Sequence, residues 1–182
     1  CQLFPRCGGC DTWHMNYQEE LSFKQEKVKN AIDKFAKSNV TIHPITPSPK
    51  QKYYRNKAQF PVQFVGGVCK FGFYRERSHD IIEIDKCLIQ SELSNELANI
   101  VANWATENKV YELRHIYIRT SGQKAFLCPV VKKLPKPEAT EKLLSLLPDY
   151  VESVVYNINN EDTNVILGKK DVVIKGDGRL ED

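Results

Sequence analysis

Residues 80–158 predict four strands and two helices in the order β-α-β-β-α-β. The expected strands are short, mostly apolar runs at residues 80–84, 114–119, 125–131 and 151–158. One helix should begin at Ser91 and carry Leu97 and Trp104 on its apolar stripe, and the other should follow Pro137. This order is typical of a ferredoxin-like fold, in which both helices cover one face of an antiparallel sheet. We therefore predict an α+β fold of this kind, and 182 residues suffice to bury one such core.

A loop and an amphipathic helix should precede this core. Residues 1–15 have no periodicity and predict a structured loop. Asn16 and Glu19 have the spacing of a capping box, so a helix should run from Asn16 to about Lys37. One face of this helix is apolar and the other is charged. A short strand is expected to follow at residues 40–45.

A basic β-hairpin should connect the helix to the core. Residues 54–64 alternate between apolar and polar side chains, which indicates a half-buried strand with a basic outer face. Pro61 suggests an edge or bulged position for this strand. Gly66-Gly67 is a hairpin turn signal. We expect a single domain in three parts, which are the loop at 1–15, the helix and basic hairpin at 16–79, and the α+β core at 80–182.

Cys1, Cys7 and Cys10 form the pattern C-x5-C-G-G-C. Iron–sulfur clusters are typically held by four cysteine thiolates, and Cys87, between an expected strand and helix, is the candidate for a distant fourth ligand. A structural zinc ion would also accept four thiolates, or three together with His14. Zinc ribbons usually show two C-x2-C knuckles, whereas this chain has one. The spacing therefore favours a cluster over zinc and leaves zinc open.

Positive charge is concentrated in the first half of the chain. Residues 1–80 hold 13 basic and 7 acidic side chains, and residues 34–75 contain eight Lys or Arg and no Asp or Glu. Such a one-signed stretch favours a polyanion, and exposed aromatic rings inside it suit single-stranded RNA. The alternative is that Tyr54 belongs to the core and the charges keep an edge strand soluble. The candidate RNA-binding residues are Lys50, Lys52, Tyr53, Arg55 and Lys57.

The sequence contains no pattern that we would assign to catalysis. It has no glycine-rich phosphate loop, and its four histidines show neither metal-pair nor triad spacing. No apolar run approaches the roughly 20 residues of a transmembrane helix, and no signal peptide is recognisable. Cys69 and Cys128 lie between apolar neighbours in expected strands, so we predict buried thiols there. Six cysteines could form three disulfides in a small secreted domain, but this chain is large enough for a real core and shows no secretory signal, so we expect a reducing, cytoplasmic location.

A series of motifs resembles one enzyme family. The motifs are C-x5-C-G-G-C at residues 1–10, Tyr54-Arg55-Asn56-Lys57, Gly72-Phe73-Tyr74 followed by Ser78-His79, and Cys87 with Leu88 and Gln90. In this order they resemble the central region of bacterial 23S ribosomal RNA (uracil-5-)-methyltransferases. The resemblance extends from Cys1 through Leu167-Gly168, which is close to the whole chain.

The resemblance implies a function and a set of ligands. Enzymes of this family have an RNA-binding TRAM barrel, a central domain with a [4Fe-4S] cluster and a methyltransferase domain that binds S-adenosylmethionine. It implies that Cys1, Cys7, Cys10 and Cys87 are the cluster ligands. Neither the barrel nor the methyltransferase domain maps onto this chain, and the family's nucleophilic cysteine and base have no counterpart here.

We therefore expect the cluster-bearing, RNA-recognising central domain of an S-adenosylmethionine-dependent methyltransferase. The parent protein should be the enzyme, and this chain alone should not be catalytic. Its expected partners are ribosomal RNA, with tRNA second, and the flanking domains, and not a membrane. The alternative is a ferredoxin-like electron-transfer module or a zinc-binding module, suggested by the strand order and the cysteines.

Overall fold

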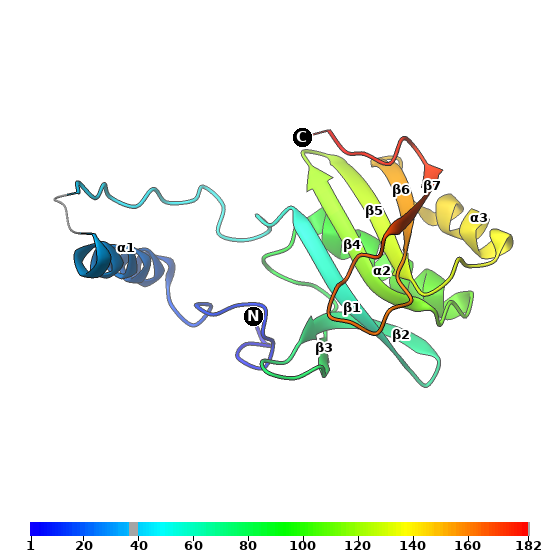
Figure 1. The fold of residues 1–182 in the computed structure, drawn as a ribbon, viewed down its shortest axis with the longest axis horizontal. Helices are drawn as coiled ribbons and strands as arrows, with labels where there is room; N and C mark the ends of the chain where they lie inside the picture. The colour runs from blue at the N-terminus through cyan, green and yellow to red at the C-terminus, as the bar shows by residue number, and fades with distance from the viewer. Residues whose placement is uncertain (37–39, 182) are drawn as a thin grey trace.

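The computed structural model describes residues 1–36 and 40–181 and has an α+β fold, as predicted (Figure 1). Within these residues, seven strands form one mixed sheet in the order β3-β2-β1-β4-β5-β6-β7. The strands are β1 (Lys57–Val65), β2 (Val68–Tyr74), β3 (Ile81–Glu83), β4 (Leu113–Ser121), β5 (Lys124–Val131), β6 (Val151–Ile158) and β7 (Lys170–Lys175). The helices are α1 (Tyr17–Phe35), α2 (Glu92–Glu107) and α3 (Pro137–Leu146).

The ferredoxin-like arrangement predicted for residues 80–158 is not formed. The elements do follow one another as β3, α2, β4, β5, α3 and β6, but β3 lies at one edge of the sheet and pairs with β2. β5 and β6 are parallel neighbours, so the sheet is mixed and not antiparallel. The reason is the short connection between β2 and β3. It lets Tyr74 pair with Ile81 at little cost in loop entropy, and so captures a three-residue strand locally.

α2 and α3 cover the same face of the sheet, as expected (Figure 1). Ser91 caps α2 as predicted, because its side chain accepts a hydrogen bond from the Ser94 amide at 3.1 Å. Trp104 of α2 is fully buried and donates its indole N–H to the Ala139 carbonyl of α3 at 2.7 Å. These contacts join both helices to one core. The largest strand side chains in that core are Phe60, Ile116, Ile118 and Leu127.

β1 is an interior strand, in contrast to the edge position suggested by its proline. Lys57 to Pro61 pair with β4, and Val62 to Val65 pair with β2. Pro61 lies where the strand changes partner, so its missing N–H interrupts neither ladder in the middle. The Gly66-Gly67 turn is formed as predicted, with φ angles of +59° and +83° that favour glycine.

α1 begins as the sequence predicts but buries nothing. Asn16 and Glu19 form the predicted capping box, and the helix extends to Phe35. The predicted end at Lys37 lies outside the described residues. No residue of α1 is buried, so its apolar stripe is not part of the core. Of the helices in residues 1–36 and 40–181, none is both long and apolar enough to span a bilayer.

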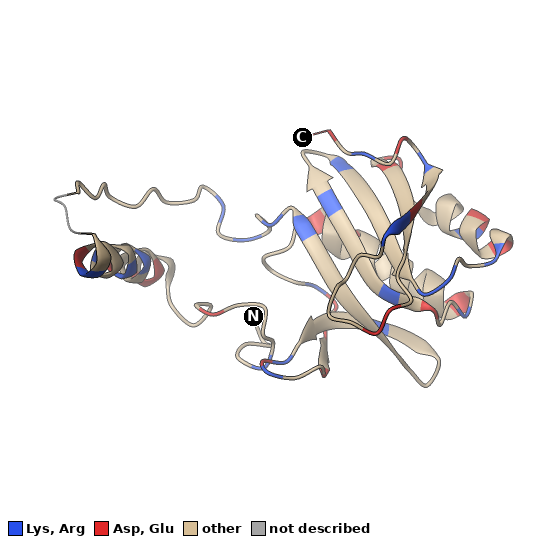
Figure 2. Ribbon diagram, in the orientation of Figure 1, with Lys and Arg blue, Asp and Glu red and all other residues tan. Residues whose placement is uncertain are grey.

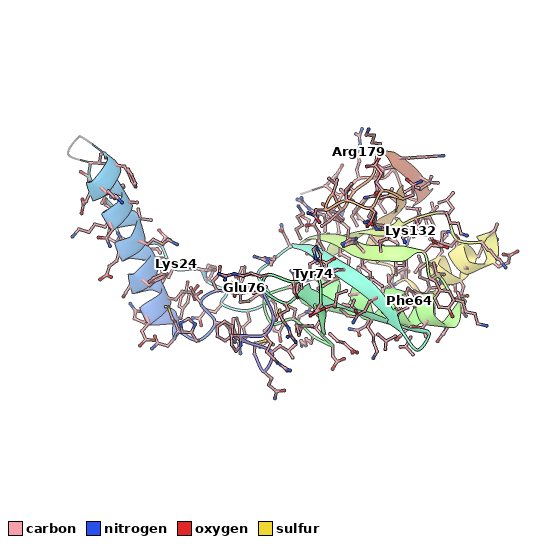
Figure 3. All side chains as sticks on the ribbon, turned by 60° about the horizontal axis from the view of Figure 1, so that its bottom comes forward. Lys24, Phe64, Tyr74, Glu76, Lys132 and Arg179 are labelled. Carbon is pink, nitrogen blue, oxygen red and sulfur yellow. The ribbon has the colours of Figure 1, made fainter. Side chains whose placement is uncertain are left out.

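The segment after α1 is extended and runs back toward the sheet (Figure 1). It contacts α1 through Ser48, whose amide donates to the Tyr17 hydroxyl at 2.6 Å, and through His43, whose carbonyl accepts from Gln25 at 3.2 Å. Figure 3 shows Lys24 of α1 at the opposite end of the molecule from Lys132 beside the sheet. The strand predicted at 40–45 is not formed, and this segment is extended without pairing in the sheet.

The sheet face opposite α2 and α3 is partly covered by the segment between β6 and β7. Asn157 exchanges two hydrogen bonds with Gly168, at 3.0 Å and 2.6 Å. Asn159 donates to the Val165 carbonyl at 2.8 Å, and Arg114 donates to the Asn159 carbonyl at 3.0 Å. These bonds hold the segment of residues 159–169 over one end of the sheet and leave the other end uncovered.

His115, a buried residue of β4, should make the stability depend on pH. Its side chain is buried, and burial, with a smaller effect of Arg114, lowers its pKa to about 4 from about 6.5. Between these values the unfolded chain takes up a proton that the folded chain excludes. The contribution of neutral, buried His115 to the free energy of unfolding is therefore fully present above about pH 6.5 and is lost as the pH falls toward 4.

We expect this histidine to lower the free energy of unfolding by about 2 kcal/mol between pH 7 and pH 4.5. Urea unfolding at both pH values measures the change. Because carboxylates also titrate in this range, His115→Leu is the control, and the difference between parent and variant isolates the histidine. An equal loss in the two proteins would contradict the assignment.

Candidate functional site

The four cysteines singled out in the sequence line a single cavity. Cys1, Cys7 and Cys10 come from the loop at residues 1–15, and Cys87 comes from the segment between β3 and α2. Cys7, Cys10 and Cys87 are partly buried, and Cys1 is exposed. The rest of the lining is mostly apolar and includes Leu3, Phe4, Trp13, Phe73 and Ile84. The fold thus brings together residues that are more than seventy positions apart in the sequence.

The cysteine loop is seated on the end of β2. The Gly8 amide donates to the Tyr74 carbonyl at 3.0 Å, and Cys7 forms a β-bridge with Arg75. A Cβ atom on Gly8 would lie only 2.9 Å from the Tyr74 carbonyl oxygen, so glycine is required for this close approach. The first glycine of the C-x5-C-G-G-C pattern, Gly8, therefore allows the cysteine loop to pack closely on β2.

The segment that carries Cys87 is held by Asn95 in the first turn of α2. The Asn95 side chain accepts a hydrogen bond from the Cys87 amide at 2.7 Å and donates to the Cys87 carbonyl at 3.0 Å. It also donates to the carbonyls of Gln90 and Ser91, at 3.3 Å and 3.1 Å. Sequence reasoning missed Asn95. Its only signal was a polar residue on the buried side of a predicted helix, and the asparagine is 5% exposed.

The sulfur atoms influence one another electrostatically. Burial raises the pKa of the Cys7 and Cys10 thiols, and the nearby Cys87 raises both further. Arg55 acts in the opposite direction on Cys10. Thiolates that are desolvated and repel one another are stabilised by a cationic metal group. Among residues 1–36 and 40–181, no three His, Cys, Asp or Glu side chains converge closely enough to hold a single metal ion.

The other two cysteines are buried, as predicted. Cys69 in β2 and Cys128 in β5 are 5% and 4% exposed, and burial raises the pKa of each thiol to about 12. Neither lines the cavity of the four-cysteine site. At neutral pH both side chains are therefore protonated thiols, and variants at these positions are suitable controls for variants of Cys1, Cys7, Cys10 and Cys87.

The basic segment is bonded to the segment that carries Cys87. The Tyr53 amide donates to the Leu88 carbonyl and the Arg55 amide to the Ile89 carbonyl, both at 2.9 Å. The Ser91 amide returns a hydrogen bond to the Arg55 carbonyl at 3.0 Å. The predicted RNA-contacting segment and the fourth cysteine are therefore parts of one short two-stranded structure.

The side chains of the basic segment differ in their surroundings. Lys50, Lys52, Arg55 and Lys57 are exposed, whereas Tyr53 is half-buried. The Lys86 ammonium lies 4.8 Å from the centre of the Tyr53 ring. Tyr54 is 53% exposed and lies before β1, so it is not a core residue. Its place in the apolar alternation is misleading, because the strand begins only at Lys57. Figure 2 shows blue stretches of ribbon, which mark Lys and Arg, along the segment that leads into β1.

The whole chain is similar to part of several proteins named RNA methyltransferases. An uncharacterized RNA methyltransferase of Clostridium acetobutylicum is 34% identical over 198 residues, and one of Clostridium tetani is 35% identical over 196 residues. Each alignment covers 100% of this chain but only 43% and 42% of the relative. The chain thus spans less than half the length of these relatives. No protein-family model matches the sequence.

A solved structure shares the fold. It is that of the Pyrococcus abyssi tRNA (uracil-54, C5)-methyltransferase in complex with S-adenosyl-L-homocysteine, which superimposes with a TM-score of 0.67 at 23% sequence identity. The match covers 92% of this chain and 40% of the solved one. Along its whole length, the chain is therefore similar to a segment of proteins named RNA methyltransferases, and it has the fold of part of one solved tRNA methyltransferase.

Proposed function

We propose that this chain is the iron–sulfur-bearing, RNA-recognising part of an S-adenosylmethionine-dependent RNA uracil-5-methyltransferase. The observation that carries the proposal is the cavity lined by four cysteines beside a basic, aromatic-containing segment. The relatives named RNA methyltransferases support the enzyme class. In this proposal residues 1–182 form one domain, and the RNA-binding barrel and the methyltransferase domain belong to the rest of the parent protein, in the cytoplasm.

Cys1, Cys7, Cys10 and Cys87 would hold a [4Fe-4S] cluster. The donor set supports this, since four cysteine thiolates are the usual ligands of such clusters. The mostly apolar lining would limit access of water, and the hydrogen bonds of Asn95 keep the fourth ligand in place. Bound there, the cluster would cross-link the residue 1–15 loop to the segment before α2. In this proposal the chain itself has no catalytic role.

The proposed substrate is RNA, with 23S ribosomal RNA as the class that we favour. The solved neighbour is named as a tRNA methyltransferase, so tRNA is the competing substrate for direct comparison. Lys50, Lys52, Tyr53, Arg55 and Lys57 would contact the RNA, and the exposure of their four cationic side chains supports that role. The named relatives do not favour the alternative of an electron-transfer or zinc-binding module.

Replacing Arg55 with lysine should weaken binding to a short RNA stem-loop about fivefold. The planar guanidinium can hold a phosphate through two hydrogen bonds, which an ammonium group cannot do. Because the charge is kept, the slope of log affinity against log salt should not change, whereas Arg55→Gln should lower its magnitude by roughly 0.7. A salt titration of RNA affinity by fluorescence anisotropy measures both quantities.

The controls for Arg55 are Arg77→Lys and Lys169→Ala. Arg77 is an exposed arginine outside the basic segment, and Lys169 is exposed just before β7. Both variants should bind RNA as the parent does. If Arg55→Lys and Arg55→Gln also matched the parent, the basic segment would be a solvated surface and not an RNA contact.

A further inference from the structure

The uncovered end of the sheet, opposite α2 and α3, presents two aromatic rings among basic side chains. We call the surface of Lys57, Gln59, Tyr117, Arg119, Lys124 and Phe126 the open sheet face. Alternate residues of β4 and β5, such as Ile118 and Leu127, point to the helices and belong to the core. The open sheet face therefore consists of the other set, which comes from three adjacent strands.

On this face of the sheet, side chains are buried at one end of β4 and β5 and partly exposed at the other. On β5, Cys128 and Val130 are buried, whereas Phe126 is only partly buried. On β4, His115 is buried, whereas Tyr117 and Arg119 are partly exposed. The two aromatic rings are therefore left accessible at one end of a surface whose other end is closed.

The aromatic rings and cations of this face lie within contact distance of one another. The rings of Tyr117 and Phe126 are 6.3 Å apart between centroids and nearly perpendicular, with an interplanar angle of 85°. The Lys57 ammonium lies 5.8 Å from the centre of the Tyr117 ring. Arg119 stands between Lys57 and Phe126 in the strand registers. Lys124 pairs with Glu152 at 2.7 Å, and the nearby Glu181 also acts on its ammonium group electrostatically.

We propose that the open sheet face binds unpaired bases of the RNA, with Tyr117 and Phe126 as stacking surfaces and Lys57 as a contact to the phosphates. The proposal rests on the proposed function, because it takes RNA as the partner, and it adds the surface and the single-stranded character of the ligand. Bases of any sequence have a π-face that stacks on an aromatic ring, and a sheet presents such rings in a plane.

Two features favour RNA over a protein as the occupant. Basic residues lie at the corresponding ends of β1, β4 and β5, where the ribbon of Figure 2 is blue, and positive charge there is complementary to a phosphate backbone. It is also continuous with the basic segment, because Lys57 begins β1 only two residues after Arg55. An RNA strand bound by Lys50, Lys52 and Arg55 could therefore extend along β1 and place its next bases on Tyr117.

The test is the affinity of the chain for a short fluorescein-labelled oligouridylate and for an RNA duplex of equal length. Tyr117→Ala and Phe126→Ala should each weaken oligouridylate binding about tenfold, since loss of one stacked base is worth that much or more. The salt slope should not change, because no charge is removed. Tyr117→Trp, which keeps an aromatic face, should restore the affinity and shows that the effect is stacking and not misfolding.

The matched control is Tyr111→Ala. Tyr111 is 53% exposed and packs edge-on against Phe64 at the other end of the sheet, so its loss should not change RNA affinity. If the parent binds RNA but Tyr117→Ala and Phe126→Ala behave like Tyr111→Ala, the open sheet face is not the RNA surface, and the proposed function stands without it. Equal affinity for the oligouridylate and the duplex would also overturn base stacking. Failure of the parent to bind either RNA would overturn both the surface and the RNA-contact part of the proposed function.

Discussion

The Cys87→Ala variant should bind almost no iron, whereas the parent should bind about four iron atoms per chain after anaerobic reconstitution. Cys87 is the one cysteine of the four-cysteine cavity that does not come from the loop of residues 1–15. The hydrogen bonds that hold its segment join Asn95 to the backbone of Cys87 and not to its sulfur. The substitution should therefore remove the thiolate and leave the surrounding structure in place. Iron and acid-labile sulfide per chain are the quantities to measure.

Cys69→Ala is the matched control for Cys87→Ala. It also removes one sulfur, but from a buried position in β2 that does not line the cavity. This variant should retain about four iron atoms, at some cost in stability because a buried side chain is shortened. Equal iron content in Cys87→Ala and Cys69→Ala would show that Cys87 is not a ligand.

The Trp104→Ala variant should lose about 3–5 kcal/mol of unfolding free energy. Trp104 of α2 is fully buried against the rest of the core, and its indole N–H donates to the Ala139 carbonyl at 2.7 Å. The substitution leaves a cavity and also leaves that carbonyl without its partner. Because domains of this size are stable by about 5–15 kcal/mol, the loss is a large share of the total. Urea unfolding should show a midpoint lower by roughly 2 M.

Two further variants test whether the loss comes from packing. Val165→Ala shortens an apolar side chain that is 62% exposed, and it should change stability by less than about 0.5 kcal/mol. Trp104→Phe keeps part of the volume and should fall between the parent and Trp104→Ala. A loss below about 1 kcal/mol in Trp104→Ala would mean that α2 does not pack on the sheet as described.

The local features of the fold could be predicted from the sequence, and the sheet order could not. Asn16, Ser91 and Gly66-Gly67 act through hydrogen bonds and φ angles within a few residues of themselves, so their spacing in the sequence is sufficient to predict them. The position of β3 in the sheet depends on which neighbouring strand it pairs with, and here that strand is β2. That is a matter of connection length and competition between partners, and apolar alternation carries no information on it.

The candidate site was predictable to the extent that its residues cluster in sequence. Cys1, Cys7 and Cys10 stand close together, whereas the resemblance supplied Cys87. Asn95 holds Cys87 from the next helix, and nothing in the spacing of the two residues distinguishes it from other buried polar side chains. Tyr117 and Phe126 lie near each other only because β4 and β5 pair in this register. Contacts of this kind follow from the fold and not from a motif.

The metal content of the parent chain tests the central proposal most directly. The chain would be reconstituted anaerobically with iron and sulfide, and iron, acid-labile sulfide and zinc would then be measured on the same sample. Four thiolates around one cavity predict about four iron atoms and four sulfides per chain, with little zinc. One equivalent of zinc and no iron would contradict the proposal and would identify the four cysteines as a structural zinc site.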